Sequence, residues 1–246
     1  MEDIAIRPAS TVVLLRDGSA GNVAAHSATD LEVLLVRRNR ALAFAGGFWV
    51  FPGGAVDDAD RERAGADEKE AARLAAAREA EEEAGIAPDP DGMVLISHWT
   101  TPVGERKRFA TWFFAAAVPP SCQVRIDEDE IHDWRWVRIV DALREHRAGS
   151  LPLLPPTYIT LCALARYTDV SSALAGERQS PCPWILPRMI PSEGERGFAT
   201  LYPGDVAYDS GDAAAVGVRH RSILDGGCWH YVYDDGVSEP PLYPLD

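Results

Sequence analysis

The chain has 246 residues, 46% of them hydrophobic, and a formal net charge of -14 at pH 7. This hydrophobic content supports a real core and excludes wholesale disorder, and the length suits one large domain or a domain with an extension. Because binding to a phosphate backbone rests on a basic surface, the acidic charge argues against a nucleic acid as partner.

The cysteines are scattered singly along the chain, and no two have CxxC spacing (Cys122, Cys162, Cys182 and Cys228). This pattern predicts neither a zinc site nor a disulfide framework, and it favours reduced thiols in a cytoplasmic protein. The first residues lack the basic and apolar segments of a signal peptide, and no apolar run approaches the roughly 18 residues of a membrane span. We therefore expect a cytoplasmic protein without a membrane partner.

The N-terminal part of the chain has the pattern of three strands. Residues 9–18 predict a strand that ends at an Asp-Gly turn, and residues 31–39 predict a second strand, buried in its middle. Residues 47–54, with the sequence GFWVFPGG, predict a short strand that ends at Pro52. A polar, charge-dense linker follows over 57–69.

The segment after this linker has the composition of a long helix. Residues 67–84 are rich in Ala, Glu, Arg and Leu, which favour helix, and Gly85 fits as the C-terminal stop. Further elements are predicted beyond it, namely strands at 93–102, 108–119 and 130–139 and a short helix at 141–149. A helix inside a set of strands predicts a mixed α/β sandwich rather than a repeating βαβ unit.

The composition changes past Leu151, and we place a soft domain boundary near residue 150, between a domain at 1–150 and a C-terminal extension at 151–246. The extension is expected to begin with a proline-marked helix at about 156–175 and to continue as a tail with short strands at 197–202, 216–221 and 228–233. Three roles are open for this tail: a lid, a homodimer contact, or a small appended sheet packed on the first domain.

Three glutamates share one face of the predicted helix. At 100° per residue, Glu79, Glu82 and Glu83 fall within an arc of about 100°, whereas Glu81 points roughly the opposite way. These like charges repel one another, and the helix dipole disfavours anions near the C-terminus. A divalent cation would reverse this energy, because Mg²⁺, Mn²⁺ and Ca²⁺ take hard oxygen ligands. The alternative is a solvated acidic face on a surface helix.

The stretch REAEEEAGI, residues 78–86, resembles the second half of the Nudix box, R-E-U-x-E-E-x-G-U, where U is bulky and apolar. All the fixed positions match, and only the first U position, Ala80, is small (Arg78, Glu79, Glu82, Glu83, Gly85, with Ile86 at the last U). The preceding FPGG turn and the order of the strands agree with this resemblance.

The first half of the box, G-x5-E-x7-R, is stretched in this chain. Counting back from Arg78 leads to Glu70, and Gly54 lies sixteen residues before Glu70 instead of six. We infer a ten-residue insertion within 55–69, which is opened by aspartates and loops away from the motif (Asp57, Asp58 and Asp60). Taking Asp60 as the early acid keeps the first spacing and breaks the second.

The resemblance covers about residues 8–150 and implies an α/β/α sandwich with a mixed sheet. It implies hydrolysis of a small-molecule nucleoside diphosphate linked to another moiety, with Mg²⁺ or Mn²⁺ as cofactor. The family pattern assigns the metal to the box carboxylates and a backbone carbonyl of the Gly-Gly turn (Glu79, Glu82, Glu83 and Gly54). Arg78 is expected to orient the carboxylates by hydrogen bonding.

The proton of the attacking water would go to Glu82, to Glu83 or to an acid further along the chain. Glu130 is the preferred later acid and Glu128 the second, in the run DEDEIHDWRWV. The alternative for this run is a polar turn before a strand.

The elongated box, with a TP segment before an R-F-x-T-x-F-F strand and LPPT at 154–157, resembles the peroxisomal coenzyme A diphosphatases and their bacterial relatives. Coenzyme A or an acyl-coenzyme A-like compound is the substrate that this implies. The upstream signature of the subgroup matches at Arg38 and Gly47 and departs at Val36, Asn39 and Ala43. We expect substrate contacts from backbone and basic residues (Arg38, Gly53, Arg106 and Arg108), with a solvated hairpin turn as the alternative for the last two.

Two other functions fit the same motif. An ADP-ribose or dinucleotide diphosphatase agrees with the missing second arginine of the coenzyme A signature, at Ala43. A Nudix-fold module that binds a ligand for regulation and has lost catalysis is the third candidate. Retention of every box glutamate argues against this module.

Overall fold

The computed structural model describes residues 4–18, 30–39, 45–127, 129–191 and 197–245. Within those residues, no helix has the length and apolar character needed to cross a membrane. The first eight strands are β1 (Ile6–Asp17), β2 (Leu31–Arg38), β3 (Trp49–Val50), β4 (Gly53–Ala55), β5 (Val94–Thr100), β6 (Arg108–Ala117), β7 (Ile131–Arg138) and β8 (Trp184–Ile185). The helices are α1 (Asp58–Ala64), α2 (Glu68–Ala84), α3 (Ile139–Arg147), α4 (Pro155–Leu164) and α5 (Val170–Gln179), with a 3₁₀ turn at Pro90–Gly92.

The main sheet is mixed and is built around β1. Its strand order is β3-β2-β1-β6-β5-β8, with β4 also paired to β1 and β7 also paired to β2. Strand β1 runs parallel to β6, whereas its other edge pairs antiparallel with β2 near Leu15 and with β4 near Ser10. One long strand thereby holds the Gly-Gly segment of β4 at the middle of the sheet.

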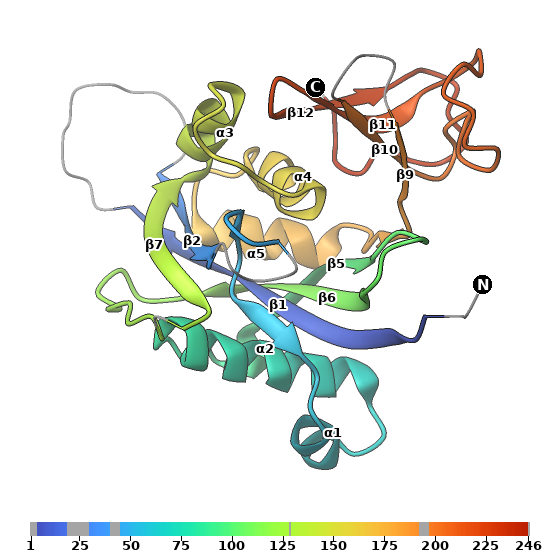
Figure 1. The fold of residues 1–246 in the computed structure, drawn as a ribbon. Helices are drawn as coiled ribbons and strands as arrows, with labels where there is room; N and C mark the ends of the chain where they lie inside the picture. Colours follow the sequence, from blue (N-terminus) through green and yellow to red (C-terminus); the bar gives the residue numbers. More distant parts are fainter. Residues whose placement is uncertain (1–3, 19–29, 40–44, 128, 192–196, 246) are drawn as a thin grey trace, which may run out of the picture.

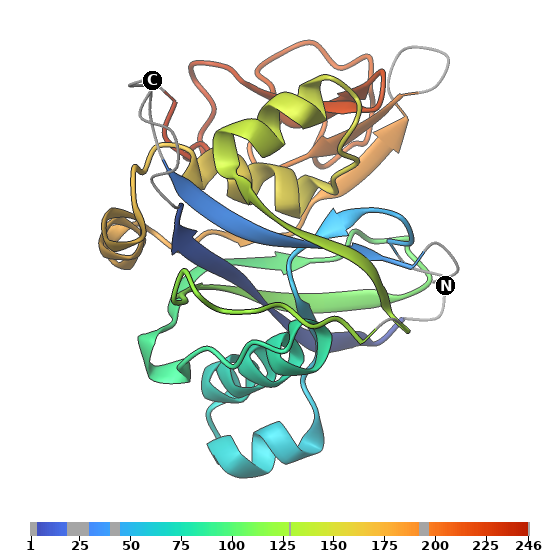
Figure 2. The ribbon, with the colours of Figure 1, turned by 90° about the vertical axis from the view of Figure 1, so that its left-hand side faces the viewer.

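Helices cover both faces of this sheet (Figures 1 and 2). Val12 and Leu14 of β1 belong to the core beneath α2, and Val13 and Leu15 belong to the core on the opposite face. Successive side chains of a strand point to opposite faces, so a continuous apolar run is the signature of a strand covered on both sides. The predicted α/β/α sandwich with a mixed sheet is therefore the observed architecture.

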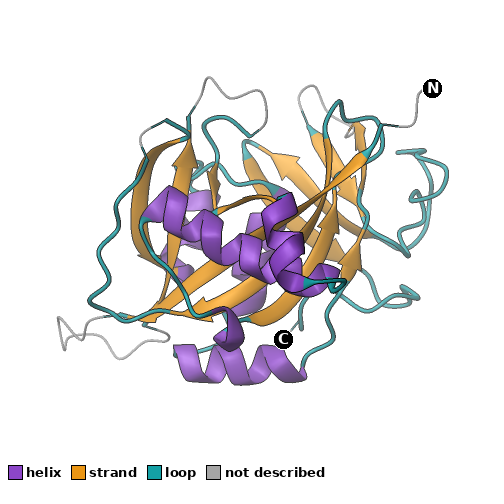
Figure 3. Cartoon of the chain, turned by 90° about the horizontal axis from the view of Figure 1, so that it is seen from below, coloured by secondary structure: helices purple, strands orange, loops and turns teal. Residues whose placement is uncertain are grey.

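Helix α2 lies on its face of the sheet through alanines, with the strands passing behind it in Figure 3 (Ala71, Ala72, Ala75, Ala76, Ala80 and Ala84). Small side chains let the helix approach the strands closely. The helix begins at Asp67, whose carboxylate accepts the amide protons of Lys69 and Glu70, and it ends at Gly85 in the left-handed conformation. These two caps set the limits of α2.

The charge-dense linker predicted at 57–69 contains a helix, which is a correction to the sequence interpretation. Helix α1 packs against α2, and its first turn is closed by the amide of Asp57, which donates to the Asp60 carboxylate at 3.0 Å. Gly65 follows its last turn with a positive φ of 70°. Asp60 is the buried residue of this short helix, so no apolar periodicity marks it in the sequence.

The opposite face is covered by α3, α4 and α5, which share one core with the sheet. A single helix was expected at about 156–175, but the structure has two, because α4 ends at Leu164 and α5 begins after Asp169. The Asp169 carboxylate accepts the amide proton of Ser172 at 2.8 Å and so caps a new helix start.

The tail forms a second, four-stranded antiparallel sheet, visible at the top of Figure 2. Its strands are β9 (Arg188–Pro191), β10 (Phe198–Leu201), β11 (His220–Asp225) and β12 (Cys228–Tyr233). The strand predicted at 216–221 is thus displaced toward the C-terminus. The buried His146 of α3 accepts the amide proton of Trp229 at Nε2, at 2.8 Å, and its Nδ1 lies 2.8 Å from the carbonyl oxygen of Leu151. The tail is therefore an appended sheet that packs on α3, whereas α4, α5 and β8 of the extension belong to the main sandwich, where β8 pairs with β5.

Candidate active site

The Gly-Gly segment of β4 and the glutamate face of α2 lie against each other. The amide of Gly53 donates a hydrogen bond to Oε2 of Glu83 at 2.9 Å. A Cβ atom added to Gly54 would lie 2.5 Å from the carboxylate of Glu79, which shows how closely that side chain approaches the strand. Two motifs that are far apart in the sequence therefore form one site.

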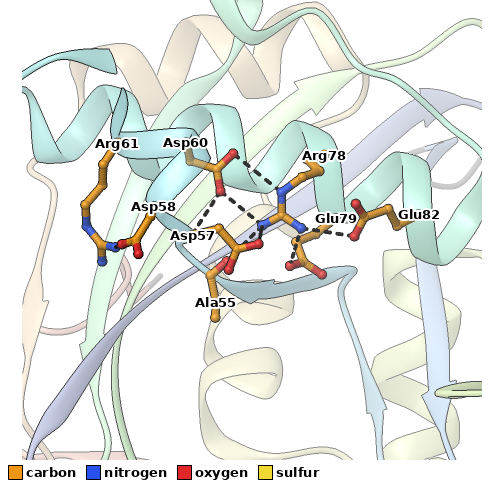
Figure 4. A network of polar contacts seen from close by, with 8 residues as sticks. All are labelled: Ala55, Asp57, Asp58, Asp60, Arg61, Arg78, Glu79 and Glu82. Carbon is orange, nitrogen blue, oxygen red and sulfur yellow. Dashed lines mark hydrogen bonds and ion pairs between the residues drawn. The ribbon is translucent and has the colours of Figure 1, made fainter. Parts of the chain in front are cut away.

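Arg78 is the centre of a network that joins α1, β4 and α2 (Figure 4). Its Nη1 donates to Glu79 at 2.8 Å and to Glu82 at 3.0 Å. Its Nη2 donates to the carbonyl oxygen of Ala55 and to the Asp60 carboxylate, both at 3.0 Å. Burial opposes the charge of Arg78, but the hydrogen bond to Asp60 and the charge of Glu79 raise its pKa above the usual range. The arginine is thus a fixed cation that orients two box glutamates.

The structure places Asp60, and not Glu70, beside Arg78. The Asp60 side chain is only 2% exposed, and it also contacts Nε of Arg78 at 3.4 Å. Glu70 instead pairs with Arg73 one turn further along α2, at 3.1 Å. The expectation that the aspartates open an insertion that loops away is therefore wrong. The extra residues come after Asp60, so the Gly54-x5-Asp60 spacing was the signal for this residue.

The buried Glu83 and the half-buried Glu79 have perturbed ionisation. Burial raises the pKa of Glu83 to about 8, against the opposing effects of the Gly53 amide and Arg38. Burial also raises the pKa of Glu79, although the charge and hydrogen bond of Arg78 act against it. The charges of neighbouring carboxylates add to both shifts. Such perturbed carboxyls are typical of functional sites.

The carboxylate oxygens of the site are the kind of ligand that a hard divalent cation binds. Carboxylates crowded on one helical face, with raised pKa values at Glu79 and Glu83, are groups that a divalent cation stabilises in their charged form. As arranged, however, no three His, Cys, Asp or Glu side chains within the described residues converge as a ready-made metal-binding group. Arg78 holds Glu79 and Glu82, and the Gly53 amide holds Glu83.

Arg38 and Glu130 are brought to the same site from other elements. Nη1 of Arg38, at the end of β2, lies 3.9 Å from Oε1 of Glu83, and its Nη2 lies 3.3 Å from Oε2 of Glu130. Glu130 stands immediately before β7. Glu128 lies outside the described residues.

The remaining candidates are not in contact with the box glutamates. Arg108 begins β6 opposite Ile6, whereas Gly54 pairs with Ser10, four residues or about 13 Å further along β1. Nε of Arg108 donates to the carbonyl oxygen of Thr101 at 3.2 Å, and Arg106 is exposed in the hairpin turn. Arg108 is therefore separated from the carboxylates along β1, and Arg106 lies in the turn just before it.

Comparison with known proteins agrees with the fold and the motif. The sequence model of the NUDIX domain matches residues 7–155, which is more than half of the chain, and the chain therefore belongs to the Nudix family. It is 24% identical over 240 residues to the putative nudix hydrolase 7 of Caenorhabditis elegans, over 83% of this chain and 79% of that protein. The crystal structure of a NUDIX hydrolase from Alicyclobacillus acidocaldarius superposes with a TM-score of 0.60 and 26% identity, over 70% of this chain and 96% of that chain. Membership of this family supports a hydrolase that acts on pyrophosphate bonds.

Proposed function

We propose that this protein is a metal-dependent diphosphatase that cleaves the diphosphate linkage of a nucleoside diphosphate derivative. The observation that carries the proposal is the close approach of the Gly53–Gly54 strand to the carboxylates of the half-buried Glu79 and the buried Glu83. Carboxylates crowded together, with one of them buried, are costly for the fold alone, and their presence is understandable where they bind a cation.

The residues of the site have two kinds of role in this proposal. Some would bind the cation, and the others orient these ligands or accept a proton. The carboxylates of Glu79, Glu82 and Glu83, with the carbonyl oxygen of Gly54, would hold Mg²⁺ or Mn²⁺. When bound, such an ion neutralises phosphoryl oxygens and lowers the pKa of water. Arg78 keeps the carboxylates oriented, and Glu82, Glu83 or Glu130 accepts the proton of the attacking water.

Gly54→Ala should impair hydrolysis without a comparable loss of thermal stability. The new Cβ would meet the flexible end of the Glu79 side chain, which can move aside, so we expect a near-normal melting temperature but a loss of most hydrolysis. In Gly53→Ala the new Cβ would lie 2.4 Å from the backbone oxygen of Ser10, so there we expect a clear loss of thermal stability. Thermal unfolding and kcat measured on both variants test this, and normal turnover in Gly54→Ala would contradict the placement of the site.

Coenzyme A or an acyl-coenzyme A-like compound is the substrate we favour. The support is the elongated box, the TP and LPPT segments, and the matches at Arg38 and Gly47. Gly53, Arg106 and Arg108 are the further substrate contacts in this proposal, with the two arginines available to phosphates distant from the scissile linkage. The absence of the second signature arginine, at Ala43, keeps an ADP-ribose or dinucleotide diphosphatase as the second candidate.

A substrate screen with Mg²⁺, Mn²⁺ or EDTA tests the proposal. Coenzyme A, acyl-coenzyme A, NADH, ADP-ribose, a dinucleoside polyphosphate and nucleoside triphosphates are compared, with the products identified by mass. We expect metal-dependent cleavage of coenzyme A to 3′,5′-ADP and phosphopantetheine, and preferred cleavage of ADP-ribose or a dinucleotide would select the second candidate. Ligand binding without turnover of any compound would indicate the regulatory module instead.

A further inference from the structure

One guanidinium, that of Arg38, is shared between two carboxylates from separate parts of the chain. Its Nη1 faces Glu83 of α2 at 3.9 Å, and its Nη2 faces Glu130 before β7 at 3.3 Å. The three side chains come from a strand end, a helix and a loop, at positions up to 92 residues apart. Arg38 is therefore the link between the box helix and the downstream acid.

The backbone of Arg38 is held at both its amide and its carbonyl group by residues 47–48. Its amide donates to the carbonyl oxygen of Phe48 at 3.1 Å, and its carbonyl oxygen accepts the amide proton of Gly47 at 2.9 Å. The pairing of β2 with β7 shifts register between Arg37 and Arg38, and a bulge of this kind re-aims a side chain. The Arg38 side chain is only 20% exposed, so its conformation is restricted by packing, unlike that of a mobile surface side chain.

Glu130, in contrast, is held at its backbone and exposed at its carboxylate. Its carbonyl oxygen accepts the amide proton of Asn39 at 2.8 Å, and its amide donates to Asp127 at 3.2 Å. Its side chain is 56% exposed and makes an ion pair with Arg38. Since an exposed glutamate ordinarily samples several rotamers, this pair is what directs its carboxylate toward Glu83.

We propose that Arg38 is a positioning residue, which holds the Glu130 carboxylate beside the box glutamates for the hydrolytic step. The inference rests on the proposed function and changes the role expected for Arg38 from the sequence. Because both terminal nitrogens of the guanidinium face carboxylates of the protein, Arg38 acts through Glu130 and does not serve mainly as a clamp for substrate phosphate.

A double-mutant cycle between Arg38 and Glu130 tests this role in the active enzyme. We expect Arg38→Met and Glu130→Gln each to lower kcat by about 10- to 100-fold with KM within about twofold, the range seen when a partner that orients a site residue is lost. The double variant should be no slower than Glu130→Gln alone, because Arg38 acts through Glu130. A raised KM with unchanged kcat in Arg38→Met, or independent and additive losses, would overturn the proposal.

Arg73→Met is the matched control. Arg73 is also 20% exposed and forms an ion pair with Glu70 at 3.1 Å, and its buried Nε, like that of Arg38, has no hydrogen-bond partner among the described residues. We expect this variant to keep the kcat of the wild type. Arg38→Lys retains the charge but not the two-pronged geometry, so it should remain slow. Wild-type kcat in Arg38→Lys would show that bridging is unnecessary and would count against the proposal.

Hydrogen–deuterium exchange gives a readout that does not depend on turnover. In the metal-free protein, Arg38→Met and Glu130→Gln should each speed exchange at the Glu130 and Ile131 amides, with no further increase in the double variant, whereas Arg73→Met should not change it. Unchanged exchange in Arg38→Met would overturn the positioning role whether or not a substrate is found. A protein that turns over no diphosphate compound would instead refute the proposed function, with the exchange data still deciding what Arg38 does.

Discussion

Glu83→Gln is expected to lower metal-dependent hydrolysis by at least about a hundredfold, which corresponds to roughly 3 kcal/mol of transition-state stabilisation. Glutamine preserves the shape of the side chain and an acceptor for the Gly53 amide, but it removes the charge that a divalent cation needs. The loss should appear in kcat with Mg²⁺ and with Mn²⁺, and metal affinity measured by calorimetry should fall as well. Glu81→Gln is the control, because Glu81 is exposed on the same helix.

The same substitution should make the metal-free protein more stable at alkaline pH. Burial raises the pKa of Glu83 to about 8 in the folded state, whereas an unfolded glutamate titrates near 4.3. The unfolded protein therefore loses this proton at lower pH, so Glu83 lowers the free energy of unfolding as the pH rises from about 4 to about 8. Melting temperatures across this range should decline less steeply in Glu83→Gln than in the wild type. Identical slopes would contradict a perturbed Glu83.

The pair of substitutions Asp60→Asn and Glu70→Gln should decide which acid belongs to the motif. The Asp60 carboxylate accepts hydrogen bonds from two nitrogens of Arg78, and Arg78 in turn contacts Glu79 and Glu82. Losing its charge weakens the contacts that hold Nε and Nη2 of the guanidinium, so we expect kcat to fall about 10- to 100-fold. The free energy of unfolding should fall by about 1–3 kcal/mol, since a buried charge-assisted hydrogen bond is weakened.

Glu70→Gln should leave both quantities near those of the wild type. Glu70 pairs with Arg73 on a half-exposed turn of α2, and such pairs contribute at most about 1 kcal/mol. Steady-state kinetics with Mg²⁺ and denaturant unfolding of both variants make the comparison. A large loss of activity in Glu70→Gln with normal activity in Asp60→Asn would restore the register inferred from the E-x7-R spacing.

The sequence alone was sufficient for the elements whose patterns are local. The pattern of residues 9–18 predicted β1, and the helix-favouring composition of 67–84 with Gly85 as its stop predicted α2. The glutamate face of α2 followed from helical periodicity, because residues three and four apart share a face wherever the helix packs. The Nudix motif and the mixed α/β/α sandwich rest on these short-range features.

The partners of the two arginines depended on tertiary structure. The E-x7-R spacing favoured Glu70 over Asp60 as the partner of Arg78. In the folded chain, packing of α1 on α2 brings Asp60 to Arg78 instead, and the number of inserted residues does not reveal this packing. Arg38 meets Glu130 only because β2 pairs with β7 through a shifted register, which joins positions 92 residues apart. Local periodicity carries no information about such contacts. The sequence therefore identified the glutamates that carry the chemistry, whereas the folded chain determined which charged side chains hold them in place.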